Sequence, residues 1–178
     1  MNISANPWTF VPADVVTTTI TSLTLNADGT VTAVVGATAA FAVENDVTVA
    51  FNTSLAGIYN GMYEVLVVVN ATTLTLVPAT PLPAGTGAAG ATGNLGLVQY
   101  NTEVRAEDIS WQSTAAPLAV STITTGDSLV ITDRAGNLIW SAVGVAGTSF
   151  SQNRGKIFWV NGLTFFAMTH GIVLITVN

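Results

Sequence analysis

The sequence is poor in charge: Asp, Glu, Lys and Arg make up 8% of its 178 residues, while hydrophobic residues make up 49%. The surface of a soluble protein usually has charged residues at about 25–35% of its positions. We therefore expect much of this chain's surface to be neutral and polar, or to be covered by other subunits.

Positive charge is lacking over the first 104 residues, since the four basic residues are Arg105, Arg134, Arg154 and Lys156. Ten acidic residues bring the net charge to −6. A chain with this balance repels phosphate groups, so direct nucleic-acid binding is not expected.

Cysteine is absent, which excludes disulfides and thiolate metal sites. The only histidine, His170, lies in a Thr-His-Gly turn, and one His alone makes neither a zinc site nor a Ser-His-acid set. The acids Glu107, Asp108, Asp127 and Asp133 lack the spacing of a calcium loop, so we expect solvated turns or weak ion pairs. The sequence predicts no catalytic residue, no cofactor and no metal site.

We also expect neither a secretory leader nor a membrane helix. Residues 1–7 contain neither a basic region nor a long apolar run. Residues 65–102 are uncharged, but Asn70, three prolines and several glycines interrupt them, so a helix of about 20 apolar residues does not fit. We expect no membrane partner.

Threonine and valine are abundant, with 27 and 23 residues. Both are β-branched and favour strands, and no stretch has a 3.6-residue apolar period, so the predicted fold class is all-β. On both sides of Asp28-Gly29, apolar side chains alternate with Thr, which predicts a hairpin. Val47, Val49 and Phe51 are expected to share one face of a later strand.

Near the C-terminus, two β-branched and aromatic runs, 157–160 and 163–166, flank Asn161-Gly162. Asn-Gly accepts the positive φ angles of a type I′ turn, so the runs predict a hairpin, which a strand at 172–177 would extend into an antiparallel meander. These runs are apolar at both alternating positions. We expect a second sheet or another subunit to cover both of their faces.

Composition also divides the chain. Residues 78–96 contain three prolines and five glycines among Ala and Thr, which is typical of a linker or a long loop. We predict an N-terminal arm at 1–14, a β module at 15–77, this Gly/Ala/Pro-rich linker or long loop at 78–96, and a C-terminal β domain at 97–178. The two β parts are expected to be small antiparallel barrels or sandwiches.

Aromatic residues are the candidates for contacts with a partner subunit or a ligand. Trp8 and Phe10 lie in the proline-containing arm, which either straps onto its own domain or anchors in a neighbouring subunit. The other aromatic candidates are Trp111, Trp140, Phe158 and Trp159. Together they could stack against a sugar, although such residues more often lie in a core.

Three segments of the β module follow one another in a characteristic order: Asn45-Asp46-Val47-Thr48-Val49, Tyr59-Asn60-Gly61-Met62-Tyr63-Glu64-Val65 and Thr72-Thr73-Leu74-Thr75-Leu76. This order resembles a small β module that recurs in virion proteins of tailed bacteriophages, with the pattern Gly-Asp-x-Val-x-Ile, Tyr-Asn-Gly-Thr-Tyr-x-Val and Thr-Thr-Phe. The sequence departs from the pattern at Asn45 and Met62, where Gly and Thr are usual. The resemblance covers roughly residues 20–77.

The resemblance implies a non-enzymatic virion protein, in particular a capsid decoration or cement protein on the outer surface of the shell, synthesised in the bacterial host cytoplasm. Its implied partners are the major capsid protein and copies of itself, in a small homo-oligomer such as a trimer. A tail, baseplate or fibre protein fits the same resemblance. The alternative from a different class is a carbohydrate-binding module on a host-facing appendage.

Overall fold

The computed structural model describes residues 6–51, 56–83, 93–113 and 122–178, and for residues 56–57 and 152–158 it describes the backbone alone. The elements are β1 (Trp8–Phe10), η1 (Pro12–Asp14), β2 (Thr17–Leu25), β3 (Val31–Val35), β4 (Asp46–Ala50), α1 (Ala56–Tyr59), β5 (Gly61–Asn70), β6 (Thr73–Pro78), β7 (Gly93–Gln112), β8 (Ser128–Thr132), β9 (Leu138–Val143), β10 (Phe150–Met168) and β11 (Ile172–Val177). The predicted all-β class is confirmed, and the described strand pairs are antiparallel.

The chain forms two compact units. Unit 1 contains Met1–Val15, Gln99–Asp133 and Leu138–Asn178, and unit 2 contains Val16–Val98 and Arg134–Asn137. Hydrogen bonds nevertheless join all the strands into one network, because β7 continues from unit 2 into unit 1. Of the segment predicted as a linker, residues 84–92 lie outside the described residues and residues 93–96 are the start of β7.

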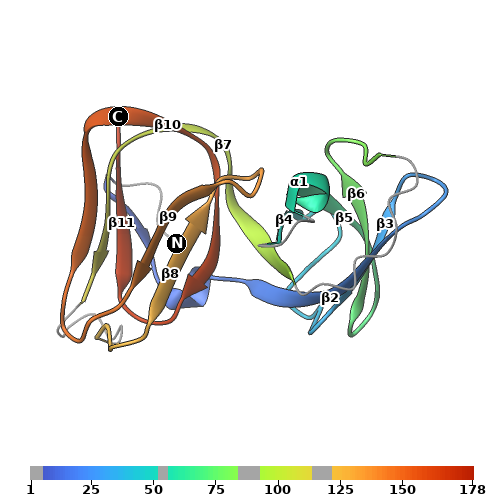
Figure 1. Cartoon of the computed structure of the whole chain (residues 1–178), viewed down its shortest axis with the longest axis horizontal. Coiled ribbons are helices and arrows are strands. Elements are labelled where there is room, and N and C mark those ends of the chain that lie inside the picture. The colour runs from blue at the N-terminus through green and yellow to red at the C-terminus, as the bar shows by residue number, and fades with distance from the viewer. Residues whose placement is uncertain (1–5, 52–55, 84–92, 114–121) are drawn as a thin grey trace. The chain divides into compact units, whose positions relative to one another are not determined.

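Unit 2 is a closed ring of strands in the order β2-β3-β6-β5-β4-β7, and the first part of β7 pairs again with β2 (Figure 1, blue to yellow-green). Residues 17–20 pair with 96–93 on one side of β7. Residues 47–50 pair with 97–94 on its other side. Because every strand in such a ring has two neighbours, the ring encloses a core of its own.

Alternation and a bulge explain which side chains fill the ring. Val31, Ala33 and Val35 are buried at every second position of β3, as a strand with one covered face requires. Ile20 and Leu23 of β2 are both buried although they are three residues apart. A bulge that follows Ile20 moves the register by one residue and so returns Leu23 to the core face.

The hairpin predicted around Asp28-Gly29 is confirmed. Leu25 of β2 lies opposite Val31 of β3, and Gly29 adopts a positive φ of 85° in the turn between them. The Asp28 carboxylate accepts hydrogen bonds from the hydroxyl and the backbone N–H of Thr30, at 2.7 and 3.0 Å. These two bonds lower the pKa of Asp28.

Val47, Val49 and Phe51 are all buried in unit 2, as the sequence predicted. The ring of Phe51 lies directly against the backbone of Gly93, where β7 begins. A Cβ atom at position 93 would lie 2.5 Å from Cε1 of that ring. Glycine at this position is therefore required by packing, which local composition alone did not show.

The strands of unit 1 follow the order β1-β11-β7-β10-β8-β9. Residues 8–10 of β1 pair with 175–173 of β11, and β11 pairs on its other side with the second part of β7. The largest side chains of the unit 1 core include Phe10, Trp111 and Phe165, all fully buried.

The hairpin predicted at Asn161-Gly162 is wrong. β10 runs without interruption from Phe150 to Met168, and β11 pairs with β1 and β7, so the last strands do not form a meander. Gly162 does adopt a positive φ of 76°, but within the strand. The buried neighbours Val160 and Leu163 hold β10 in place there, so long-range packing outweighs the local preference for a turn.

The contact between Gly93 and Phe51 gives a test of how unit 2 closes. We expect Gly93→Ala to lower the free energy of unfolding by about 1–3 kcal/mol, because the added methyl overpacks the ring of Phe51. Denaturant unfolding of Gly93→Ala, Phe51→Leu and the double variant should show less than additive losses, since leucine leaves room for the methyl. Strictly additive losses would show that the two residues do not meet.

Candidate functional site

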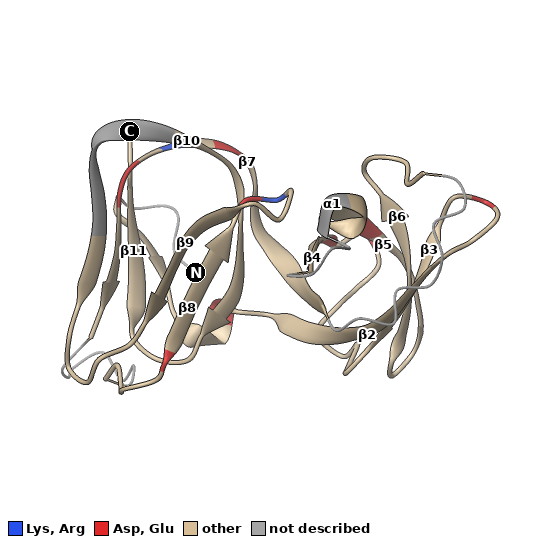
Figure 2. Cartoon of the chain, viewed as in Figure 1, with Lys and Arg blue, Asp and Glu red and all other residues tan. Residues whose placement is uncertain are grey.

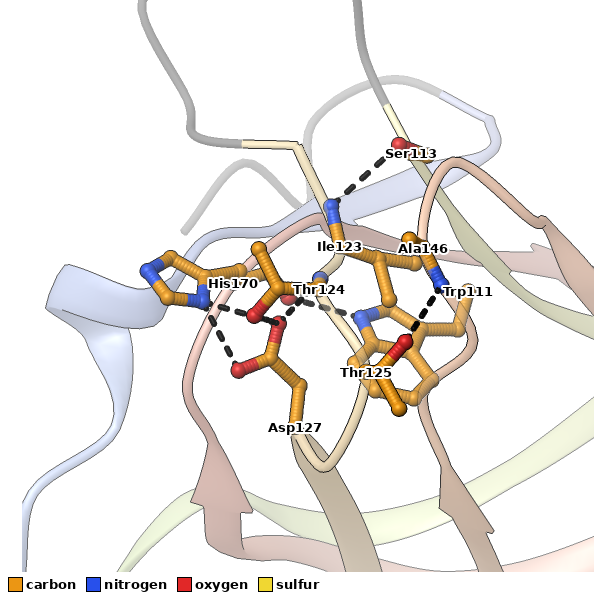
Figure 3. A network of polar contacts seen from close by, with 8 residues as sticks. All are labelled: Trp111, Ser113, Ile123, Thr124, Thr125, Asp127, Ala146 and His170. Carbon is orange, nitrogen blue, oxygen red and sulfur yellow. Dashed lines mark hydrogen bonds and ion pairs between the residues drawn. The ribbon is translucent and has the colours of Figure 1, made fainter.

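A polar network surrounds Asp127, which directly precedes β8 (Figure 3). One carboxylate oxygen accepts hydrogen bonds from the backbone N–H and the hydroxyl of Thr124, at 2.6 and 3.0 Å. Nδ1 of His170 lies 2.8 and 2.9 Å from the two carboxylate oxygens. An ionised carboxylate only accepts hydrogen bonds, so Nδ1 carries the hydrogen in this contact.

The backbone at His170 is fixed from the other side by Trp111. The indole Nε1 donates a 2.7 Å hydrogen bond to the carbonyl oxygen of His170. The next residue, Gly171, has a φ of 83°, and a Cβ there would lie 2.7 Å from the same Nε1. Trp111 itself is buried and stacks on Phe150, with ring centres 5.7 Å apart. His170 is therefore the turn residue that the sequence predicted, between β10 and β11.

The Asp127–His170 pair has two of the three members of a catalytic triad. A triad also needs a hydroxyl or thiol on the second ring nitrogen of the histidine. Within the part of the chain that the structure describes, no hydroxyl bonds that nitrogen, and the hydroxyl of Thr124 bonds the carboxylate instead. No cluster of three metal-binding side chains occurs among the described residues either. The arrangement ties three segments of unit 1 together.

The surroundings of Asp127 favour its ionised form. Partial burial raises the pKa of this carboxyl, but the backbone N–H of Thr124, the ring of His170 and the Thr124 hydroxyl together lower it below its ordinary value. The ionised carboxylate of Asp127 thus accepts charge-assisted hydrogen bonds that hold the network together.

Unit 2 has an open groove of about 500 Å³ beside the start of β5 and the segment Pro78–Pro83. Tyr63 lies in its wall, but its hydroxyl donates to the carbonyl oxygen of Tyr59 at 2.8 Å, and burial raises its pKa further above its usual range. Neither property suits an acid–base catalyst at neutral pH. The described residues that line the groove include no pair of an acid and a base that could act together on a substrate.

The most unusual surface of the described chain is an apolar one on β5. Leu66, Val67, Val68 and Val69 are consecutive, and their exposed fractions are 43%, 45%, 36% and 54%. We call this run, together with Val43 and Val77, the β5 patch; the two added valines are 53% and 38% exposed. A run of three or four exposed apolar residues is unfavourable in a soluble protein unless it has a function.

Two bulges explain why four neighbouring side chains reach solvent. The register between β5 and β6 shifts between Val65 and Val67 and again between Val68 and Asn70. Each shift interrupts the alternation that would turn every second side chain into the ring. Backbone hydrogen bonds join Glu44 and Asn45 to Val65, which brings the segment after Val43 alongside β5. Figure 2 shows how sparse the charged residues are.

The two residues predicted as partner contacts lie within the core of unit 1. Trp8 is 8% exposed and packs against Tyr100, with ring centres 4.6 Å apart. Phe10 is fully buried and packs against Phe165 at 4.7 Å. The arm thus straps onto its own unit through β1, and its aromatic side chains are engaged there.

The other aromatic candidates whose side chains are described make no ring contact with one another. Trp111 is buried and Trp140 is half-buried, while the side chain of Phe158 lies outside the described residues. Trp159 is 63% exposed, and the guanidinium carbon of Arg105 lies 5.3 Å from its ring centre. The sequence analysis missed the β5 patch, although Leu-Val-Val-Val directly after the alternating Tyr63-Glu64-Val65 is a signal for it.

Comparison with known proteins gives no match: no protein-family model, curated protein or solved structure is similar to this chain. Among the residues that the structure describes, no helix has the length and apolar character needed to cross a membrane. The geometry of the surfaces is therefore the basis for a functional proposal.

The network around Asp127 predicts a specific pH dependence. The folded pKa of Asp127 is below the unfolded value of about 3.9, so its stabilising contribution is complete above that pH and is lost as the pH falls through the folded pKa. We expect Asp127→Asn to lower the Tm at neutral pH and to flatten the acid side of the stability curve.

Thermal unfolding between neutral pH and about pH 2 measures both effects. Glu103→Gln, which removes an exposed carboxyl of β7, is the matched control for the loss of one charge. An acid-side slope that is the same in Asp127→Asn as in the wild type would contradict the assigned role.

Proposed function

We propose that the chain is a non-enzymatic structural protein of a tailed-phage virion, a decoration protein that binds the outer surface of the assembled capsid shell. Two observations support the proposal. The segments at 45–49, 59–65 and 72–76 resemble a module of such virion proteins. The same module, in unit 2, exposes the β5 patch.

The β5 patch is the single observation on which the proposed contact depends. Apolar side chains gain about 25 cal/mol for each Å² removed from water, so exposing six of them is unfavourable unless a partner covers them. Leu66–Val69 themselves carry no charge, and the exposed carboxylates of Glu64 and Glu44 lie at the border of the patch, beside Val77 and Val43. The partner in this proposal is the major capsid protein.

The proposed mechanism is stabilisation by linkage. A protein that binds the assembled shell and not its separated subunits makes disassembly harder by its binding free energy. No bond is made or broken in this function. In the proposal the two units act as small β modules, with unit 2 contacting the shell and unit 1 contacting copies of the same chain.

Quantitative mass spectrometry of purified particles tests the assignment. We expect a copy number near that of the major capsid protein, and particles that lack this protein should lose their genome at a lower temperature. A copy number of only a few per particle would favour a tail, baseplate or fibre position instead. Intact particles without the chain in their outer shell would contradict the proposal.

The β5 patch gives a sharper test on the molecule itself. We expect Leu66→Ser with Val69→Ser to weaken binding to assembled shells by roughly 10- to 100-fold, because two partly exposed side chains no longer bury apolar area. The Tm should change little, since both side chains are exposed. Co-sedimentation with shells measures the binding.

Val145→Ser is the matched control, because Val145 is 53% exposed but belongs to unit 1. It should bind shells as the wild type does. Equal binding by the double variant and the wild type would exclude the β5 patch as the contact surface.

The carbohydrate-binding alternative has one observation in its favour, the exposed ring of Trp159 on β10. An accessible aromatic face can stack on a sugar ring. Binding on a glycan array that disappears in Trp159→Ala, while shell binding is absent from the wild type, would decide for this alternative.

A further inference from the structure

The last strand in the sheet order of unit 1 is β9, Leu138–Val143. Among the strand pairs that the structure describes, its single partner is β8. The outer side of β9 therefore presents backbone N–H and C=O groups to which another extended strand can bind.

β9 lacks the charged residues and prolines that often protect a sheet edge, and its one irregularity is a register shift against β8 at Ile139, near its first residue. Its sequence, Leu-Ile-Trp-Ser-Ala-Val, contains no charged residue and no proline. The strand at the opposite end of the order, β1, is only three residues long and lies between Pro7 and Pro12. Of these two edges, β9 is the one suited to pairing.

The side chains of β9 are also incompletely covered. Leu138 and Val143, at its two ends, are 62% and 68% exposed. Ile139, Trp140 and Ala142 pack against the unit 1 core but are only partly buried. A strand added beside β9 would complete the burial of these residues on both faces of the sheet.

We propose that β9 pairs with β9 of a second copy of this chain, antiparallel and about a two-fold axis, so that the two sheets continue into each other. A two-fold contact uses the same surface on both chains and closes after two copies. Both free β9 edges disappear in one step. The inference concerns unit 1 alone and does not depend on the virion assignment.

The side chains of β9 match those of a second β9 when the register places Ser141 opposite Ser141 of the second chain. Opposite residues in an antiparallel pair point to the same face, so this register sets Trp140 opposite Ala142 on the core face. It sets the exposed Val143 opposite Ile139, which lies at the register shift of β9 and itself packs against the unit 1 core. A large side chain thus meets a small one, and the exposed Val143 gains an apolar neighbour.

Charge favours a second copy over a charged partner. The chain has a net charge of −6, so two copies approach each other favourably only through surfaces without acids. All six residues of β9 meet that condition. A basic partner strand would find no carboxylate on β9 with which to pair.

The first test is the mass in solution, by sedimentation equilibrium of the full chain. The wild type is expected at twice the 18.3 kDa mass of one chain. Ser141→Lys should sediment as a single chain, because two lysines would face each other across the axis. Thr24→Lys, an exposed position on β2, is the matched control and should remain dimeric.

The second test fixes the register. The chain has no cysteine, so Ser141→Cys introduces a unique thiol. Opposite Cα atoms of antiparallel strands lie about 4.5–5.5 Å apart, which is within the range of a disulfide. Mild oxidation should yield a covalent dimer for Ser141→Cys and none for the control Thr24→Cys.

Three outcomes would overturn the proposal. These are a wild type at the mass of one chain, a dimer or trimer that persists in Ser141→Lys, and equal cross-linking of the two cysteine variants. Circular dichroism of each variant distinguishes loss of pairing from loss of fold, since a folded single chain is the expected state of Ser141→Lys.

Discussion

The structure depends on the pairing of one strand, β7, with four others. Its first part lies between β2 and β4 and closes the ring of unit 2. Its second part lies between β11 and β10 in unit 1. Where this strand begins, glycine is needed at position 93, because the ring of Phe51 leaves no room for a side chain.

Local patterns in the sequence predicted what depends on near neighbours. Alternating apolar and Thr residues around Asp28-Gly29 gave the first hairpin correctly, and Val47, Val49 and Phe51 lie in the core as expected. The all-β class followed from composition. These features need only strand alternation and turn chemistry, which are visible within ten to twenty residues of sequence.

Long-range pairing explains what the sequence analysis missed. Asn161-Gly162 looks like a turn, but buried neighbours on each side hold β10 straight through it. The glycines at 93 and 96 look like part of a linker or long loop, yet Gly93 pairs with β2 and Gly96 pairs with both β2 and β4. The bulges of β5 and the unpaired side of β9 depend on which strands lie next to each other in the sheet. No short window of sequence contains that information.

The polar contacts of unit 1 stabilise the fold, whereas the exposed apolar residues are the candidates for binding a partner. Asp127 accepts hydrogen bonds from Thr124 and His170, and Trp111 donates one to the backbone of His170, so these polar contacts fix the turn before β11. The unsatisfied surface of the chain is apolar instead, on β5 in unit 2 and on β9 in unit 1. A molecule with such a distribution is suited to assembly.

The pairing of β1 with β11 has a consequence for synthesis. Residues 8–10 leave the ribosome early, but their partner residues 173–175 are made much later. The strands of the unit 2 ring are complete once residue 98 has been made, so this unit can close while translation continues. At about 5–20 residues per second, Trp8 and Phe10 then wait on the order of ten seconds for β11. Throughout that interval β1 lacks the strand with which it pairs, and Phe10 lacks the ring of Phe165 against which it packs.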